Sequence, residues 1–369
     1  MIRRPVLHIL VVLLWLAAPA AAQTPLTLTE AIARARAQNP DAGAAAAAER
    51  EAAHRVTQAR AAYWPKVDLT ESWQRGNQPV FVFSSLLAQR QFSSADFALE
   101  ALNRPDAIGN FQSSLTVEQS IFDGAARARV TAAGIGGDIA ATRRTMVDQD
   151  LAAGVTAAYG RVLMAAAGQR AAGAAEETAR ADRELAGNRR DAGIVTDADV
   201  LQLDVHVART AEQRIRVASD EQIARAQLNQ LMGEPLAASF ALDEAPRSTP
   251  VTSADIATLE REALESRPDI AAAILQESLA GTAHTAARAA FLPQVAVQGG
   301  WEWNGGAWNA RASSWVVGAV ARVNLFQGFA DKARVAEARE QVARRGLERQ
   351  KAETAARLDV HAAVARLEA

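Results

Sequence analysis

The period of hydrophobic and polar positions changes along the chain, and each change predicts a switch between helix and strand. After Pro65, the apolar residues Val67, Leu69 and Trp73 alternate with polar residues. A period of two is typical of a strand with one apolar and one polar face. Three further runs alternate in the same way, so strands are expected at 66–74, 113–122, 294–303 and 313–326.

Long proline-free stretches separate the strands and predict long helices. No proline occurs between Pro105 and Pro235. A helix from about Ala125 to about Arg190 would be roughly 100 Å long at ~1.5 Å per residue. A descending helix from about Thr196 to Met232 would complete a hairpin over about 125–232. Four residues of that helix follow a 4-3-7 spacing and predict an imperfect coiled-coil seam: Leu201, Val205, Ala208 and Ile215.

Two proline landmarks recur at one offset and predict an internal duplication. Residues 60–65 (RAAYWP) and 288–293 (RAAFLP) lie 228 positions apart, as do Pro40 and Pro268. Both segments end a helical pattern and begin an alternating one. The prediction is a duplicated helix-helix-strand-strand-helix unit. The expected bounds are a first repeat at 23–235, a connector at 236–252 and a second repeat at 253–369.

The second repeat is expected to be incomplete in this sequence. Phe122, at a strand end, lies 71 positions before Gly193, where the first hairpin is expected to turn. The same spacing from Phe326 places a second turn near position 397, about 28 positions beyond Ala369. Either the sequence is truncated or the protein lacks a second hairpin, and the register favours truncation.

The first 22 residues have the pattern of a signal peptide. Arg3 and Arg4 precede an apolar run from Val6 to Leu16, and small residues at 20–22 suit signal peptidase. This run is too short to cross a bilayer as a helix, and no later stretch is expected to supply the ~18 apolar residues required. The prediction is an exported protein without a helical anchor.

The amino-acid composition excludes several kinds of binding site and partner. The chain contains no cysteine, which excludes disulfides, thiolate metal sites and a lipid on cysteine. Without Arg3 and Arg4 of the signal peptide, 38 basic side chains face 42 acidic ones, so no nucleic acid partner is expected. The five histidines are scattered and form no i,i+4 pair: His8, His54, His206, His284 and His361. No catalytic residue, metal site or cofactor is therefore predicted, and the protein is not expected to be an enzyme.

The amphipathic strands allow two interpretations. They could form a half-buried sheet in a soluble protein. Alternatively they span a membrane, in which case four strands cannot close a barrel and several chains must pool them, because an open edge would leave backbone groups unpaired in hydrocarbon. Tryptophans gather in the strands, as in the interfacial girdles of outer-membrane barrels, and favour the second interpretation: Trp73, Trp301, Trp303 and Trp315, with Trp308 beside them.

From Leu26 to Ala369 the sequence resembles the TolC-like outer-membrane efflux proteins. The helix entry 28–32 (LTEAI), Asn39-Pro40 and the strand ends at 122–124 and 326–328 carry part of the likeness. The most specific motif is 193–201 (GIVTDADVL), because the helical turn of that family has a glycine followed six positions later by Asp-x-Leu.

The resemblance implies a homotrimer in a Gram-negative bacterium, with a shared β-barrel in outer-membrane lipid joined to a long α-helical barrel across the periplasm. It also implies a periplasmic adaptor protein and an inner-membrane pump as partners. The function implied is a passive exit duct of a tripartite efflux or type I secretion system. The alternative is an exported periplasmic coiled-coil adaptor or structural protein, against which the duplicated strand-bearing order argues.

Residues at the expected helical turn are the candidate docking site for the adaptor. Gly193 would permit the turn, Asp199 would cap a helix or form an ion pair, and exposed apolar residues would contact a neighbour. The alternative is that Gly193 and Asp199 only close the hairpin. The complete candidate set is Arg190, Gly193, Ile194, Val195, Thr196, Asp199 and Leu201. Nothing in the sequence indicates which compounds are transported.

Overall fold

A computed structural model describes residues 25–243 and 255–368. The predicted signal peptide and positions 244–252 of the predicted connector lie outside this range. The described chain forms two compact units, one of residues 25–45 and 146–243 and the other of residues 46–145 and 255–368. The predicted repeats at 23–235 and 253–369 divide the chain differently, since the second unit combines strands of both.

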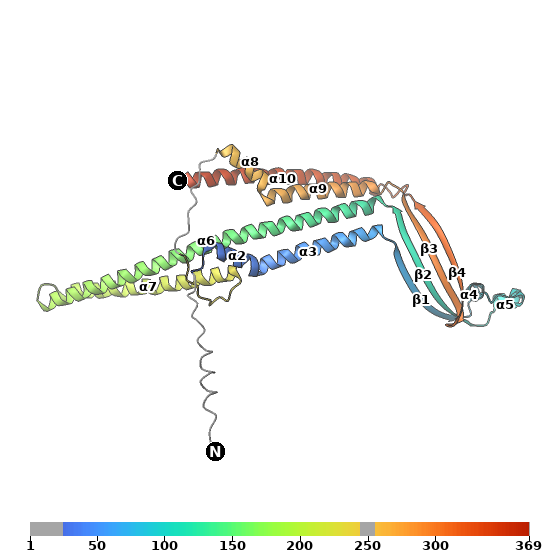
Figure 1. Ribbon diagram of the computed structural model, residues 1–369, viewed down its shortest axis with the longest axis horizontal. Coiled ribbons are helices and arrows are strands. Elements are labelled where there is room, and N and C mark those ends of the chain that lie inside the picture. The colour runs from blue at the N-terminus through green and yellow to red at the C-terminus, as the bar shows by residue number, and fades with distance from the viewer. Residues whose placement is uncertain (1–24, 244–254, 369) are drawn as a thin grey trace, which may run out of the picture. The chain divides into compact units, whose positions relative to one another are not determined.

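The first unit contains α2 (Leu28–Gln38), the C-terminal part of α6 (Gly124–Asp191) and α7 (Asp197–Met232). The two long helices form an antiparallel hairpin (Figure 1). Thr27 begins α2 with a capping box, in which its hydroxyl accepts from the Glu30 amide and Glu30 accepts from the Thr27 amide. The core consists mainly of alanine, valine and leucine residues, which let the helices approach closely, together with Tyr159 and Met232: Ala31, Ala35, Val155, Ala158, Tyr159, Val162, Leu228 and Met232.

The helix α6 is more apolar than the sequence analysis expected. The expectation that no later stretch is apolar enough to cross a membrane is wrong for this helix, which contains an 18-residue window that passes by length and composition. Alanine, glycine and valine score as apolar in such a window. Val155, Ala158 and Val162 of α6 are fully buried in the core, so packing within the unit accounts for part of its apolar character, although most of the window is not buried.

The predicted seam of α7 is also wrong. Leu201 and Ile215 are 64% and 68% exposed, and Val205 and Ala208 are exposed as well. The covered positions lie on an adjacent stripe with spacings of three and four, in which only the position of Arg214 is exposed: Val200, Leu203, Val207, Thr210, Val217, Glu221, Ala224 and Leu228. The stripe was not recognised in the sequence because it includes polar residues such as Thr210 and Glu221. They are accommodated by pairing, as in the 2.6 Å contact of Arg214 with the buried Glu176 of α6.

The second unit is organised around one antiparallel sheet in the order β1-β2-β3-β4. The helix α3 (Pro40–Arg60) continues through a 3-10 turn (Ala61–Tyr63) to β1 (Lys66–Gly76). The other strands are β2 (Ile108–Phe122), β3 (Gln294–Ala307) and β4 (Ala310–Arg322). All four predicted strands therefore exist, and β1, β2 and β3 are longer than predicted.

The end of β4 and the β3–β4 connection differ from the prediction. β4 ends at Arg322 and not at 326, because Gln294 pairs with Arg322 and the preceding Pro293 has no N–H to extend the ladder. The side chain of Asn324 then bonds Asp331 at the start of the next helix. The connection is a turn of two residues at 308–309, shorter than the interval 304–312 left between the two predicted strands.

Residues 77–107, between β1 and β2, belong to the stretch 76–110, which breakers such as Gly76, Pro79 and Pro105 predict to be an irregular excursion. They instead contain α4 (Pro79–Ala88), a 3-10 turn (Ser94–Phe97) and α5 (Leu99–Asn103). These elements lie at the end of the sheet opposite the long helices of this unit (Figure 1). We call residues 77–107 the insert.

The remaining helices of the second unit pack side by side. They are α8 (Ile256–Ser266), α9 (Pro268–Ala289) and α10 (Ala330–Glu368). Gly346 of α10 lies against Glu277 of α9, which bonds Arg349 at 2.8 Å. Arg267, before α9, bridges Asp269 and Asp359 at 2.9 Å each, and these partners raise its pKa.

Candidate functional sites

The turn between α6 and α7 is closed by backbone geometry that requires glycine. Gly193 has a φ of 75°, in the left-handed region. Its N–H donates to the Arg190 carbonyl at 2.8 Å, and the N–H of Ile194 donates to the Arg189 carbonyl at 2.9 Å. This pair of bonds is a Schellman motif, which satisfies the last carbonyls of α6. The structure thus places Gly193 where the sequence predicted a turn.

Thr196 and Asp199 start α7 with a second capping box. The amide of Thr196 donates to Asp199 at 2.8 Å, and the Thr196 hydroxyl accepts from the Asp199 amide. The hydroxyl also lies 2.7 Å from the Asp199 carboxylate. These bonds to the ionised form lower the pKa of Asp199. Asp199 therefore caps the helix, which is one of its two predicted roles.

The same turn presents an apolar surface with a charged flank. Ile194 and Leu201 are largely exposed, and Val195 is half-buried. Arg190 pairs with the adjacent Asp191 at 2.7 Å, which raises its pKa. Val200 was not singled out in the sequence, although it is buried beside Leu201 and belongs to the covered stripe of α7. Its spacing to Leu203 and Val207 was the available signal.

The sheet has two chemically different faces. The row Leu69, Leu115, Trp301 and Trp315 runs across all four strands, and the neighbouring row contains Val67, Val117 and Val317. We call this side the apolar face. On the other side, the polar face, one row contains Thr70, Ser114, Glu302 and Ser314. Leu69 and Trp315 are 71% and 70% exposed, so no described residue covers this part of the apolar face.

The predicted girdle tryptophans all lie on the apolar face, in the half of the sheet nearer the insert. Trp301 and Trp303 stack with ring centroids 5.9 Å apart, and Trp301 pairs with Trp315. Trp73 pairs with Phe111, whose ring also meets Trp308 edge to face. The structure therefore brings all four predicted residues together, with Trp303 more covered than the others.

A second group of aromatic residues lies at the opposite end of the sheet, at the helix–strand junctions. The sequence analysis used some of these residues as repeat landmarks and did not recognise them as a group. Their shared signal was an aromatic residue within four positions of a strand end or a helix start. The group is largely exposed and consists of Tyr63, Trp64, Phe122, Phe291, Phe326 and Phe329.

A charged cluster interrupts the apolar face near the β3–β4 turn. Arg311 lies over the Trp308 ring at 3.6 Å and pairs with Glu71 of β1 at 3.3 Å. The hydroxyl of Ser113 bonds both side chains. Within the described residues, no group of three or more histidine, aspartate or glutamate side chains is arranged to hold a metal ion.

The architecture, with its two-faced sheet, connected helices and long hairpin, is that of outer-membrane efflux proteins. Comparison with known proteins supports this class. The chain matches the family described as outer membrane efflux protein over residues 31–234 and 259–369 and belongs to that family. Its role is therefore that of an outer-membrane efflux channel protein, and the TolC-like resemblance and predicted fold class are confirmed.

Several solved channels share the fold at low sequence identity. The Campylobacter jejuni CmeC outer membrane channel is 16% identical with a TM-score of 0.72, and the match covers 88% of this chain and 67% of the CmeC chain. VceC of Vibrio cholerae is 18% identical with a TM-score of 0.73, covering 93% and 79% respectively. The Neisseria gonorrhoeae MtrE outer membrane channel is 18% identical with a TM-score of 0.73, covering 94% and 74%. Comparison with curated protein sequences finds no match.

Proposed function

We propose that three copies of this chain form one channel through the outer membrane of a Gram-negative bacterium, with a large periplasmic portion built from the long helices. Substrates handed over by an inner-membrane pump and a periplasmic adaptor would pass through it without further input of energy. The observation that carries this proposal is the sheet, which has an aromatic-flanked apolar face, a polar face and unpaired edges.

The spacing of the two aromatic groups supports a membrane-spanning sheet. Trp64 and Trp73 are nine positions apart, which is ~30 Å along a strand at ~3.3 Å per residue. A tilt of ~40°, usual in such barrels, reduces this to a height of ~23 Å, close to the ~25 Å apolar band of outer-membrane barrels. Val67, Leu69 and Leu115 fill the interval with apolar side chains.

The edges of the sheet support assembly from several copies. In the described part of the chain, β1 and β4 each pair with one neighbour. Their outer N–H and C=O groups would be costly in hydrocarbon, whereas β4 of one copy can pair with β1 of the next and close a ring. The polar face, with Thr70, Ser114 and Glu302, would then line the water-filled interior.

The hairpin turn supports a docking role for the adaptor. Ile194 and Leu201 are exposed apolar residues on a turn that Gly193, Thr196 and Asp199 hold in one conformation. A fixed apolar tip with a charged flank at Arg190 suits contact with another helical hairpin.

Membrane fractionation tests the channel proposal. We expect the protein in the outer-membrane fraction, with a trimer band on unheated gels that becomes a monomer band after boiling. Recovery in the soluble periplasmic fraction would contradict it. Docking is tested separately, because Leu201→Ser should weaken adaptor cross-linking while leaving the trimer band unchanged. Thr178→Ser, on an exposed part of α6, is the matched control.

A further inference from the structure

The helix α4 exposes an apolar stripe that the other described residues leave largely uncovered. Its sequence, PVFVFSSLLA, contains no charged residue. Val80, Ser84 and Leu87 are exposed along one helical face. Phe83, at the border of this face, is 36% exposed and packs against Phe92 with ring centroids 4.8 Å apart. Val80 is 81% exposed. An exposed apolar stripe of this kind marks an interaction surface.

The opposite side of α4 is anchored on the polar face of the sheet. Phe81 lies 3.8 Å from the Cβ position of Gly76 in β1. The Gln89 side chain, just after α4, donates to Asn110 of β2 at 3.0 Å, and Asn110 donates to Asn304 of β3 at 2.9 Å. These three polar side chains are buried and mutually satisfied, which fixes the position of the helix end.

A fourth contact reaches the last strand. Arg90 adopts a φ of 57°, which is unfavourable for a residue with a side chain, and its guanidinium donates to the Ser313 carbonyl of β4 at 2.8 Å. The segment from Phe81 to Arg90 therefore contacts all four strands and crosses the end of the polar face. The stripe of Val80 and Leu87 points away from that face.

Charge decides between lipid and protein as the partner of this stripe. Helices that lie on membranes carry lysine or arginine on their polar side. The insert contains two basic residues, Arg90 and Arg104, against the three acidic residues Asp96, Glu100 and Asp106. It is also anchored on the polar face, whereas the tryptophans lie on the apolar one. A second copy of the same uncharged stripe is the partner that fits.

We propose that the α4 stripes of neighbouring copies converge over the outer mouth of the channel and form an apolar constriction. This inference rests on the proposed trimer. If the polar face lines the interior, a helix that crosses this face projects its free side toward the channel axis. Three uncharged stripes meeting there would exclude water and slow ion passage.

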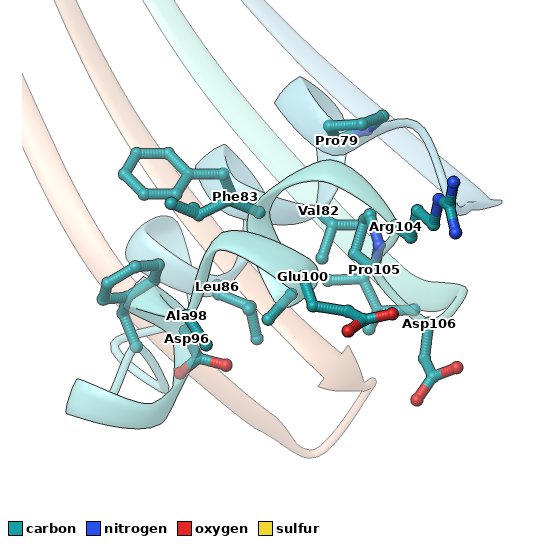
Figure 2. Close-up of a pocket in the computed structure, with 14 residues that line it drawn as sticks. Pro79, Val82, Phe83, Leu86, Asp96, Ala98, Glu100, Arg104, Pro105 and Asp106 are labelled. Atoms are coloured by element: carbon teal, nitrogen blue, oxygen red, sulfur yellow. The ribbon is translucent and has the colours of Figure 1, made fainter.

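The space beside α4 would let this constriction adjust. A partly open pocket of about 500 Å³ separates α4 from the α5 segment. Figure 2 shows Val82, Phe83 and Leu86 along the α4 side of this pocket and Ala98 and Glu100 along the α5 side. The side chains along the α4 side of this pocket therefore have room to change conformation without disturbing strand pairing.

Cysteine cross-linking tests the convergence, since the natural chain has no cysteine. Leu87→Cys places a thiol on the stripe, and Leu99→Cys places one on α5, where Leu99 is more exposed, at 78% against 50% for Leu87. With a short bismaleimide on intact cells, we expect covalent dimers and trimers for Leu87→Cys and far fewer for Leu99→Cys. Equal yields from the two variants would overturn the proposal.

Conductance gives an independent measurement. In planar bilayers, the double variant Val80→Ser with Leu87→Ser should conduct severalfold more than the unmodified channel, whereas Leu99→Ser should not change conductance. The trimer band on unheated gels shows that each variant assembles.

The outcomes separate the two proposals. A trimer that conducts normally but shows neither cross-linking nor a conductance change would overturn the constriction and leave the channel intact. Absence of any trimer would overturn both. Labelling of Leu87→Cys only by a lipid-soluble maleimide would identify a lipid-facing helix and also overturn the constriction.

Discussion

Arg311 forms an ion pair with Glu71 at 3.3 Å although the two residues belong to β4 and β1, the outermost strands of the sheet. The path between them crosses β3 at Gly305. A Cβ atom at Gly305 would lie 2.9 Å from Arg311 Cγ and 2.1 Å from the Ala310 carbonyl oxygen. The missing side chain therefore makes room both for the tight turn and for the arginine.

The first prediction concerns this glycine. Gly305→Ala should displace the β3–β4 turn and break the Arg311 contact, because the clash is with backbone as well as side chain. The temperature at which the trimer band disappears should fall by several degrees. Gly318→Ala is the matched control, since a Cβ at Gly318 meets nothing within 4 Å and should leave this temperature unchanged.

The second prediction concerns the ion pair itself. Arg311→Met should leave Glu71 without a cation on the apolar face and destabilise the assembly by about 1–2 kcal/mol. This is below the ~3–5 kcal/mol of a fully buried pair because Glu71 is 39% exposed. Adding Glu71→Met to the same chain should restore much of the loss. A double variant no more heat-resistant than Arg311→Met would show that the charge pairing is unimportant.

The third prediction separates the covered and exposed stripes of α7. Val200→Ala should lower the free energy of opening the hairpin tip by about 2 kcal/mol, because it removes two buried methyl groups and leaves a cavity. Leu201→Ala should have little effect on the tip, because Leu201 is 64% exposed. Amide hydrogen exchange at the start of α7 measures both. Equal loss of protection would contradict the observed seam.

The fourth prediction concerns pH. The bonds from Thr196 lower the pKa of Asp199 in the folded protein. Its stabilising contribution is therefore fully present above the ordinary value of 3.8 and is lost as the pH falls through the lowered folded value. A carbon-13 NMR titration of the Asp199 carboxyl should give a midpoint below 3.8. Thr196→Val should move that midpoint upward, and an unchanged midpoint would disprove the capping role.

The helix N-terminus at Thr196 could be predicted because its determinants are local. Gly193 and the Thr196–Asp199 pair encode the turn within a few residues, and strands such as β1 follow from a simple alternation. The α7 seam could not be predicted because two stripes one residue apart both suit a coiled coil. Only the partner helix decides between Val200 and Leu201, and the favoured stripe contains Arg214, whose partner Glu176 is distant in sequence.

The insert was missed for a different reason. The uncharged segment 79–88 shows no period, and Pro79 and Gly76 suggested a loop. Its helix is fixed by contacts with four strands, including Gln89 with Asn110. Likewise, the Arg311–Glu71 pair depends on an empty position at Gly305, which a sequence pattern does not reveal.

The two hairpins of the sheet differ greatly in their outer connections, with 31 residues between β1 and β2 and two between β3 and β4. The duplicated strands alone would give a closed ring of three copies a nearly sixfold repeat. In the proposed trimer, the unequal connections would reduce this to true threefold symmetry at the cell surface. An antibody or bacteriophage protein that recognises the insert would therefore find three equivalent binding positions around the rim, with a tight turn between each pair.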